Sequence, residues 1–206
     1  MVEAAPLQPR SLKEIAELIQ GCRRCDLWRC ATQGVPGEGP AHAPMMLVGE
    51  QPGDQEDLAG KPFVGPAGQV LDRALAEAGV PREDAYVTNA VKHFKHELRG
   101  KRRLHKTPDA GEVAACRWWL DNERRLVRPR VIVALGATAV LGVFGRPMPI
   151  GKNRGQAFQL EDQAQGFVTW HPSFLLRLPD PAARKKAYAE FVEDLALVHE
   201  RVKAAA

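Results

Sequence analysis

The sequence contains no apolar run as long as the about 18 residues that a membrane-spanning helix needs. It also contains no internal repeat and no low-complexity tract apart from a short Ala-rich end. Residues Met1 to Pro9 lack the basic segment and apolar core of a signal peptide. These absences favour one globular domain over residues 1–206, in an intracellular, cytoplasmic setting and with no membrane partner.

Cysteine is scarce as well, with only Cys22, Cys25, Cys30 and Cys116 in 206 residues. Cys22 and Cys25 form a C-x-x-C pair. In an intracellular protein such a pair indicates metal or redox chemistry rather than a structural disulfide.

Apolar strand patterns alternate with helical ones along the chain. Buried strands are expected at residues 45–49, 85–91, 131–135 and 166–170, and 156–160 is a candidate edge strand. Helices are expected from the capping box Ser11–Glu14 toward Cys22, over 65–80, from a Thr107–Pro108 cap to about 127, through 144 after Gly136, and over 181–202. This alternation predicts an α/β fold: a three-layer α/β/α domain with a central, mostly parallel, four-stranded sheet.

Polar residues lie at or just after the ends of four of these strands: Glu50 and Gln51, Thr88 and Asn89, Thr138, and finally His171 and Ser173. In parallel sheets ligands bind outside the carboxyl ends of the strands. One polar residue at a strand end is usually only a turn former. Because four strand ends converge, the pattern predicts a site at this edge.

A basic stretch lies between residues 92 and 106, and Glu97 is its one acid; its cations are Lys92, Lys95, Arg99, Lys101, Arg102, Arg103 and Lys106. Such a concentration is the electrostatic footprint of phosphate binding. A solvated loop explains the charges equally well. We expect a basic insertion loop over about 93–106.

Several segments resemble the iron–sulfur uracil-DNA glycosylases of the family 4 type, in order and over nearly the whole chain. They are residues 49–53 (GEQPG), 61–68 (KPFVGPAG), 87–92 (VTNAVK), 115–117 (ACR) and 171–173 (HPS). The basic insertion with 101–105 (KRRLH) resembles the UdgX subgroup, whose members stay bonded to DNA, and Gln51 fits that subgroup too. The subgroup usually has isoleucine where this chain has Leu104.

The resemblance implies a uracil-DNA glycosylase-like fold and a monomeric DNA-repair hydrolase. Its substrate would be uracil-containing DNA, including single-stranded DNA, and free uracil would be a product. Such an enzyme takes the base out of the stack and reads it in a pocket.

The same resemblance assigns the roles of the strand-end residues. Phe63 would stack on uracil, and Asn89 would pair with its polar edge. His171 would stabilise the charge that grows on the departing base. The chemistry of a sugar cation gives two further roles: Glu50 would stabilise the cation, and Gln51 would position groups and help to bind uracil, as would His171. Asp54, Glu56 and Asp57 compete for the acid's role. Without the resemblance, a core Phe, a turn Asn, a structural His and a solvated acidic loop would be the commoner readings.

His105 is the strongest prediction from the UdgX-like insertion. A neutral imidazole is a nucleophile, and its attack on C1′ of the sugar would leave the protein covalently bonded to DNA. Lys101, Arg102, Arg103, Lys106 and Ser173 would contact the DNA backbone. Residue types alone would make His105 just another backbone contact.

The family pattern also implies a [4Fe–4S] cluster. Its ligands here would be Cys22, Cys25, His93 and Cys116, with His93 standing where the family has cysteine. Cys30 is the rival fourth ligand. Zinc accepts three cysteines and one histidine too, so the ligands alone do not identify the metal.

Two alternatives stay open at this point. One is a conventional iron–sulfur glycosylase with many turnovers, in which water takes the place of His105. The other is a damaged-DNA-binding module without catalysis.

Overall fold

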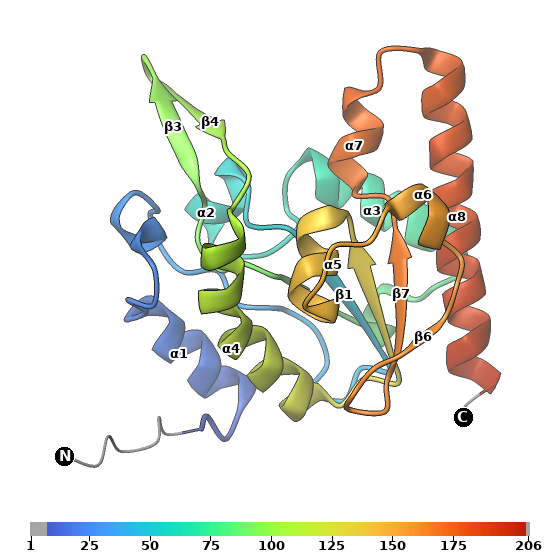
Figure 1. Cartoon of the computed structure of the whole chain (residues 1–206), viewed down its shortest axis with the longest axis horizontal. Helices are drawn as coiled ribbons and strands as arrows, with labels where there is room; N and C mark the ends of the chain where they lie inside the picture. Colours follow the sequence, from blue (N-terminus) through green and yellow to red (C-terminus); the bar gives the residue numbers. More distant parts are fainter. Residues whose placement is uncertain (1–7, 205–206) are drawn as a thin grey trace.

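The computed structural model describes residues 8–204 (Figure 1). The prediction about a signal peptide concerns residues 1–9, of which only Gln8 and Pro9 lie in this range. The last two residues of the Ala-rich end also lie outside it. Within 8–204 no helix is both long enough and apolar enough to span a bilayer.

The centre of the molecule is one twisted sheet. Strands β1 (Met45–Gly49), β2 (Ala85–Asn89), β5 (Val131–Leu135) and β7 (Gln165–Thr169) run parallel in the order β2-β1-β5-β7. A fifth strand, β6 (Phe158–Gln159), pairs antiparallel with β7 at the edge. The prediction of four strands is therefore one too few. The candidate edge strand does form, but only two of its residues pair with β7.

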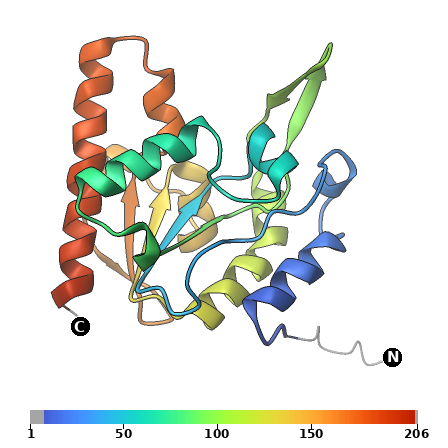
Figure 2. The ribbon, with the colours of Figure 1, turned by 180° about the vertical axis from the view of Figure 1, so that it is seen from behind.

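Helices cover both faces of the sheet, which confirms the three-layer α/β/α architecture. Met45 and Leu47 of β1 pack toward α3 (Pro66–Glu77) and α8 (Pro181–Ala204). Met46 and Val48 point the other way, toward α4 (Ala110–Val127) and α5 (Ala137–Phe144). This alternation follows from the two-residue period of a strand, and all four side chains are buried because both faces are covered. Figure 2 views the molecule from the side of α3 and α8.

Two of the predicted helix caps have different outcomes. At α1 (Leu12–Gln20) the Ser11 hydroxyl accepts the Glu14 N–H at 3.1 Å, as predicted, whereas the Glu14 carboxylate reaches back to Arg10 N rather than to Ser11. The Thr107–Pro108 cap is wrong. Asp109 caps α4, because its carboxylate accepts Glu112 N–H and the Glu112 carboxylate accepts Asp109 N–H.

The expected loop over 93–106 is instead mostly a β-hairpin that projects from the body (Figures 1 and 2). Strands β3 (His96–Arg99) and β4 (Arg102–His105) pair antiparallel around Gly100 and Lys101, with Gly100 at φ +62°. Glycine at positive φ suits such a tight turn. The charge density of this segment concealed its strand pattern.

Five short helical segments in the described residues were not predicted. They are α2 (Asp54–Ala59), α6 (Ile150–Asn153), α7 (Pro172–Arg177) and the 3₁₀ turns Asp26–Arg29 and Arg82–Asp84. Each has six residues or fewer, too short for a periodic apolar pattern to identify.

Candidate active site

A cavity of about 280 Å³ opens at the carboxyl ends of β1, β2 and β7, between the sheet and the hairpin. Its wall includes all of the predicted catalytic and base-binding residues: Glu50, Gln51, Phe63, Asn89, His105 and His171. Ser173 lines it as well. The strand ends therefore converge as expected, and the hairpin adds His105 from outside the sheet.

One wall of the cavity joins an aromatic ring to an amide. Phe63 has φ +55°, a left-handed backbone that is rare outside glycine, and Asn89 ends β2 with only 3% of its surface exposed. A Cβ atom on Gly49 would lie 2.4 Å from Asn89 Oδ1 and 2.6 Å from Phe63 Cζ. Only glycine at position 49 lets both side chains reach this wall.

His171 lies opposite, 6.3 Å from Phe63 between ring centroids. Its Nδ1 accepts the backbone N–H of Ser173 at 3.1 Å and lies 2.7 Å from the Ser173 hydroxyl. Burial lowers the pKa of His171 to about 4, although the nearby charge of Glu50 opposes the shift. A neutral ring whose Nδ1 accepts a hydrogen bond carries its proton on Nε2, so His171 is prepared to donate from that atom.

Glu50 connects two elements of the site. Its Oε2 accepts the Thr138 hydroxyl at 3.0 Å, and its Oε1 lies 3.1 Å from His105 Nε2. Burial raises the pKa of Glu50, but the adjacent His105 and the hydrogen bond from Thr138 lower it more, so the net pKa lies below its ordinary value. Glu50 is therefore a carboxylate at neutral pH, facing the imidazole.

Gln51 holds the base of the hairpin. Its amide N–H groups donate to the carbonyls of Lys95 at 3.1 Å and Lys106 at 3.0 Å, and its Oε1 accepts Lys95 N–H at 2.8 Å. The side chain thus closes both ends of the segment that carries His105. These contacts support the positioning role expected of Gln51, which also lines the cavity.

The three competing acids are occupied by structural contacts. Asp54 and Asp57 pair with Arg103, and Asp57 also accepts Thr32 N–H at 3.0 Å. Glu56 accepts the backbone N–H groups of Gly53 and Gly65 at 3.1 and 2.7 Å. Glu50 is therefore the acid best placed to act on a ligand in the cavity.

The basic residues divide into exposed and engaged side chains. Lys101 and Arg102 are exposed at the hairpin tip, and Lys106 pairs with Glu97 at 2.9 Å on the adjacent strand. Arg103 anchors the hairpin to α2 through Asp54 and Asp57. Lys92 is fully buried and pairs with Glu123 at 2.7 Å, so it does not belong to the basic surface.

Three of the four cysteines lie near one buried apolar cluster. Cys22 and Cys116 belong to it, and Cys25 packs against it, whereas Cys30 is exposed. The thiols of Cys22 and Cys116 accept hydrogen bonds at 3.2 Å from the Trp119 indole and from Lys92 N–H respectively.

His93 is buried too, and its Nε2 lies beside Gly34, 3.3 Å from where a Cβ would be. In the described part of the chain no three side chains are arranged to hold a metal ion. The residue types nevertheless suit an iron–sulfur cluster, since thiolates and imidazoles are both known ligands of such clusters. Burial raises the pKa of Cys116 to about 12, which opposes the alternative of a reactive free thiol there.

The family model described as the uracil DNA glycosylase superfamily matches residues 36–196. The chain belongs to this superfamily. It is 39% identical over 193 residues to a type-4 uracil-DNA glycosylase of Pyrobaculum aerophilum, covering 90% of this chain and 92% of that protein. It is 40% identical over 164 residues to a type-4 uracil-DNA glycosylase of Thermotoga maritima, covering 79% and 82%. A type-5 uracil-DNA glycosylase of Pyrobaculum aerophilum is 31% identical over 173 residues, 75% of this chain and 72% of that protein.

The superfamily match spans β1 through most of α8, so it includes every predicted residue of the cavity. These comparisons do not distinguish the UdgX subgroup within the uracil-DNA glycosylases. The subgroup and the role of His105 therefore belong with the proposals below.

Two residues of the site received no role from the sequence, although Thr138 was among the polar residues expected at this edge. Thr138, in the first turn of α5, orients Glu50, and its place just after a strand was the available signal. Arg177, at the end of α7, lines the cavity and is exposed. No pattern pointed to it, because α7 itself was not predicted.

Proposed function

We propose that the protein is a uracil-DNA glycosylase that excises uracil from DNA and retains the resulting sugar covalently on His105. The observation that carries the proposal is the 3.1 Å contact between His105 Nε2 and Glu50 Oε1 inside the cavity of Phe63, Asn89 and His171. A nucleophile and a base within hydrogen-bond reach are the signature of covalent catalysis.

Recognition of uracil rests on Phe63 and Asn89. The ring offers a stacking face, and the amide offers a donor beside an acceptor, which matches the N3–H and a carbonyl of uracil. Within residues 8–204 the Asn89 side chain makes no hydrogen bond to protein, so both of its groups are free for the base.

Excision breaks the bond between C1′ and uracil N1, and the electron pair leaves with the base. The resulting anion carries charge at O2, where the Nε2–H of His171 can donate a hydrogen bond. The sugar becomes an oxocarbenium ion, and the Glu50 carboxylate stabilises its positive charge.

Capture then forms a bond between His105 Nε2 and C1′. When its proton is on Nε2, His105 faces the Glu50 carboxylate at 3.1 Å. Glu50 accepts that proton, and the electron pair left on Nε2 makes the bond to C1′. The proton finally neutralises the departing uracil anion. Because the carboxylate lies against the attacking nitrogen, no water has to enter between them.

The decisive experiment mixes the protein with a single-stranded oligonucleotide containing one uracil and separates the products on a denaturing gel, with and without hot alkali. We expect a slow band that survives denaturant and requires uracil. Alkali cleavage at the uracil position without a slow band would instead mean a conventional glycosylase with many turnovers. The absence of both the slow band and the alkali cleavage would leave only the DNA-binding module.

His96 provides a matched control, because it lies directly opposite His105 in the hairpin register and stacks on Phe94. His105→Ala should abolish the slow band, and His96→Ala should retain it. Persistence of the adduct in His105→Ala would assign the bond to another residue.

We further propose that Cys22, Cys25, His93 and Cys116 bind a [4Fe–4S] cluster. The buried cluster that contains Cys22 and Cys116, and the N–H groups directed at their sulfur atoms, support this assignment. When bound, the cluster would supply cross-linking between α1, the segment after β2 and α4. The catalytic residues act without it in the steps above.

Iron, zinc and sulfide analysis of the purified protein tests this assignment, together with the visible charge-transfer absorption of iron–sulfur clusters. Cys116→Ser should lose iron and sulfide, and Cys30→Ser should retain them. Bound zinc without sulfide would make the centre a zinc site. Loss in Cys30→Ser with retention in His93→Ala would make Cys30 the fourth ligand.

A further inference from the structure

A second cavity, larger than the catalytic one, lies at the far end of α4 and α5. It has a volume of about 760 Å³, and the last three turns of α4, the end of α5 and the β6 segment form its walls. The two cavities share no lining residue. We call this second cavity the arginine groove, because five arginines line it: Arg117, Arg124, Arg125, Arg128 and Arg146.

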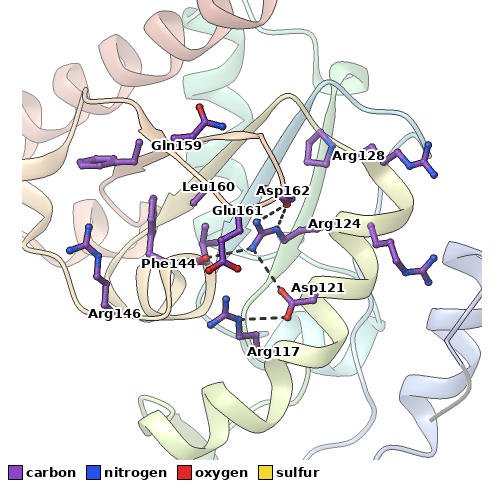
Figure 3. A pocket seen from close by; sticks show the side chains of 14 residues that line it. Arg117, Asp121, Arg124, Arg128, Phe144, Arg146, Gln159, Leu160, Glu161 and Asp162 are labelled. Carbon is purple, nitrogen blue, oxygen red and sulfur yellow. Dashed lines mark hydrogen bonds and ion pairs between the residues drawn. The ribbon is translucent and has the colours of Figure 1, made fainter. Parts of the chain in front are cut away.

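Two of these arginines have structural tasks that use their guanidinium groups. Arg124 donates to Asp162 at 2.7 and 2.9 Å and thereby fixes the turn after β6 against α4 (Figure 3). Arg125 donates to the Pro9 carbonyl and to Asn122 Oδ1. These pairs build the wall of the groove rather than offer charge to a ligand.

The other three are far less engaged. Arg117 has only a loose pair with Asp121 at 3.6 Å. Arg128 and Arg146 are exposed, and neither makes an ion pair within residues 8–204. Figure 3 places Arg146 and Arg128 on opposite sides of the Arg124–Asp162 pair. The groove therefore offers positive charge at both ends.

The backbone at Arg128 adds a second observation. It ends α4 with φ +53°, the left-handed conformation in which glycine is the usual residue. A residue with a side chain at that position has a conformational cost, and such costs often accompany functional sites. Gly145, which ends α5 in the same conformation, has no side chain, and a Cβ there would lie 2.8 Å from Arg117 Nη1.

Between the charged ends lies an apolar surface. Phe144 and Phe158 are partly exposed and meet edge to face, with ring centroids 5.8 Å apart. Aromatic faces between guanidinium groups suit bases that alternate with phosphates, since every base has a flat face for stacking. Guanidinium groups bind phosphate oxygens in a bidentate fashion.

We propose that the arginine groove binds a short single-stranded segment of nucleic acid, with phosphates at its two ends and bases against Phe144 and Phe158. The segment binds independently of the catalytic cavity, so the inference does not rest on the glycosylase reaction. Asp121, Asp162 and the exposed Glu161 also line the groove, which limits the site to a few phosphates.

The test is an NMR titration of the full chain with 5′-phosphorylated dithymidylate, which contains no uracil, observing the arginine Nε–H signals. We expect shifts at Arg117, Arg128 and Arg146, weakened by added salt. The double variant Arg128→Gln/Arg146→Gln should bind at least about tenfold more weakly, equivalent to about 1.4 kcal/mol. Lys185→Gln/Lys186→Gln, which removes two exposed charges from α8, should bind as the unmodified chain does.

Two further titrations test which kind of ligand the groove binds. Thymidine 5′-monophosphate should bind more weakly than the dinucleotide, because it reaches only one end of the groove. Equal binding by the double variant, or shifts confined to the catalytic cavity, would overturn the proposal. Groove shifts with hexaglutamate but none with the dinucleotide would also overturn it and make the site one for acidic protein segments.

Discussion

At the scale of single residues, the catalytic cavity depends on two side chains whose charge states are set by their surroundings. His171 is neutral because burial lowers its pKa to about 4, and Glu50 is ionised because its partners lower its pKa below 4.5. A neutral donor and an anionic stabiliser can coexist over a wide pH range. The catalytic arrangement should therefore be robust on the acidic side of neutrality.

This leads to a prediction for the pH dependence of excision. Protonation of His171 would oppose the Ser173 donors, and protonation of Glu50 would remove the charge that stabilises the sugar, so both effects reduce the rate as pH falls. The single-turnover rate of uracil release should be flat between about pH 8 and 5 and should fall through about pH 4. Quenched-flow measurement of free uracil tests this; a break near pH 6.5 would show that His171 titrates like an ordinary histidine.

The Glu50 carboxylate can be tested by itself. Glu50→Gln keeps the size of the side chain but can neither accept the His105 proton nor stabilise the sugar cation. We expect adduct formation to slow by roughly 10²- to 10⁴-fold, the usual contribution of a positioned general base. Glu56→Gln is the comparison, since Glu56 bonds backbone N–H groups instead, and a similar loss there would remove the special role of Glu50.

At the scale of elements, the hairpin is the part of the fold that supplies His105, the residue proposed to capture the sugar. Its outer half is exposed, but Gln51 clamps its base and Arg103 fixes one strand to α2. A nucleophile must be held close to the reacting geometry, since small displacements cost large factors in rate. The hydrogen bonds at the base of the hairpin therefore matter as much as His105 itself.

Gln51→Leu separates capture from excision. The substitution removes three hydrogen bonds to the hairpin ends but leaves Glu50, Asn89 and His171 in place. We expect uracil release to continue while the adduct yield falls severalfold, so that alkali-labile sites accumulate without the slow band. Release and capture declining in parallel would argue that Gln51 acts on the base directly.

At the scale of the whole molecule, one buried ion pair supports the sheet beneath the site. Lys92 and Glu123 are both fully buried and lie 2.7 Å apart, and the Lys92 ammonium also donates to Thr88 Oγ1 and the Asn89 carbonyl. Breaking a buried pair leaves one uncompensated charge in the interior. The pair therefore stabilises the end of β2, which carries Asn89.

Lys92→Met should lower the free energy of unfolding by about 3–5 kcal/mol, whereas Lys95→Met, at a partly exposed pair with Glu112, should lower it by about 1 kcal/mol or less. Urea unfolding followed by circular dichroism measures both values. Lys92→Met/Glu123→Gln should recover part of the loss, because no unpaired charge remains and the amide oxygen can still accept from Gly37 N–H and the Tyr86 hydroxyl. Equal effects of the two single variants would mean that burial adds nothing to the Lys92 pair.

The sequence by itself determined the layers, the four parallel strands and the residues that meet at their carboxyl ends. Strand and helix periodicity are local, and parallel strands bring their ends to one edge whatever the details of packing. That is why Glu50, Asn89 and His171 could be named in advance. The same reasoning could not place Lys92 in the interior, because a basic run has the same composition whether its lysines are solvated or paired.

Only the tertiary structure decided how the hairpin meets the sheet. In the folded chain the expected basic loop forms two paired strands, and Arg103 pairs with Asp54 and Asp57. His105 lies beside Glu50, from which it is 55 positions away in the sequence. The tertiary structure likewise gathered Arg117, Arg128 and Arg146 into one groove from separate segments. Contacts of this kind depend on side chains distant in sequence, whose pairing energies exist only once the chain has folded.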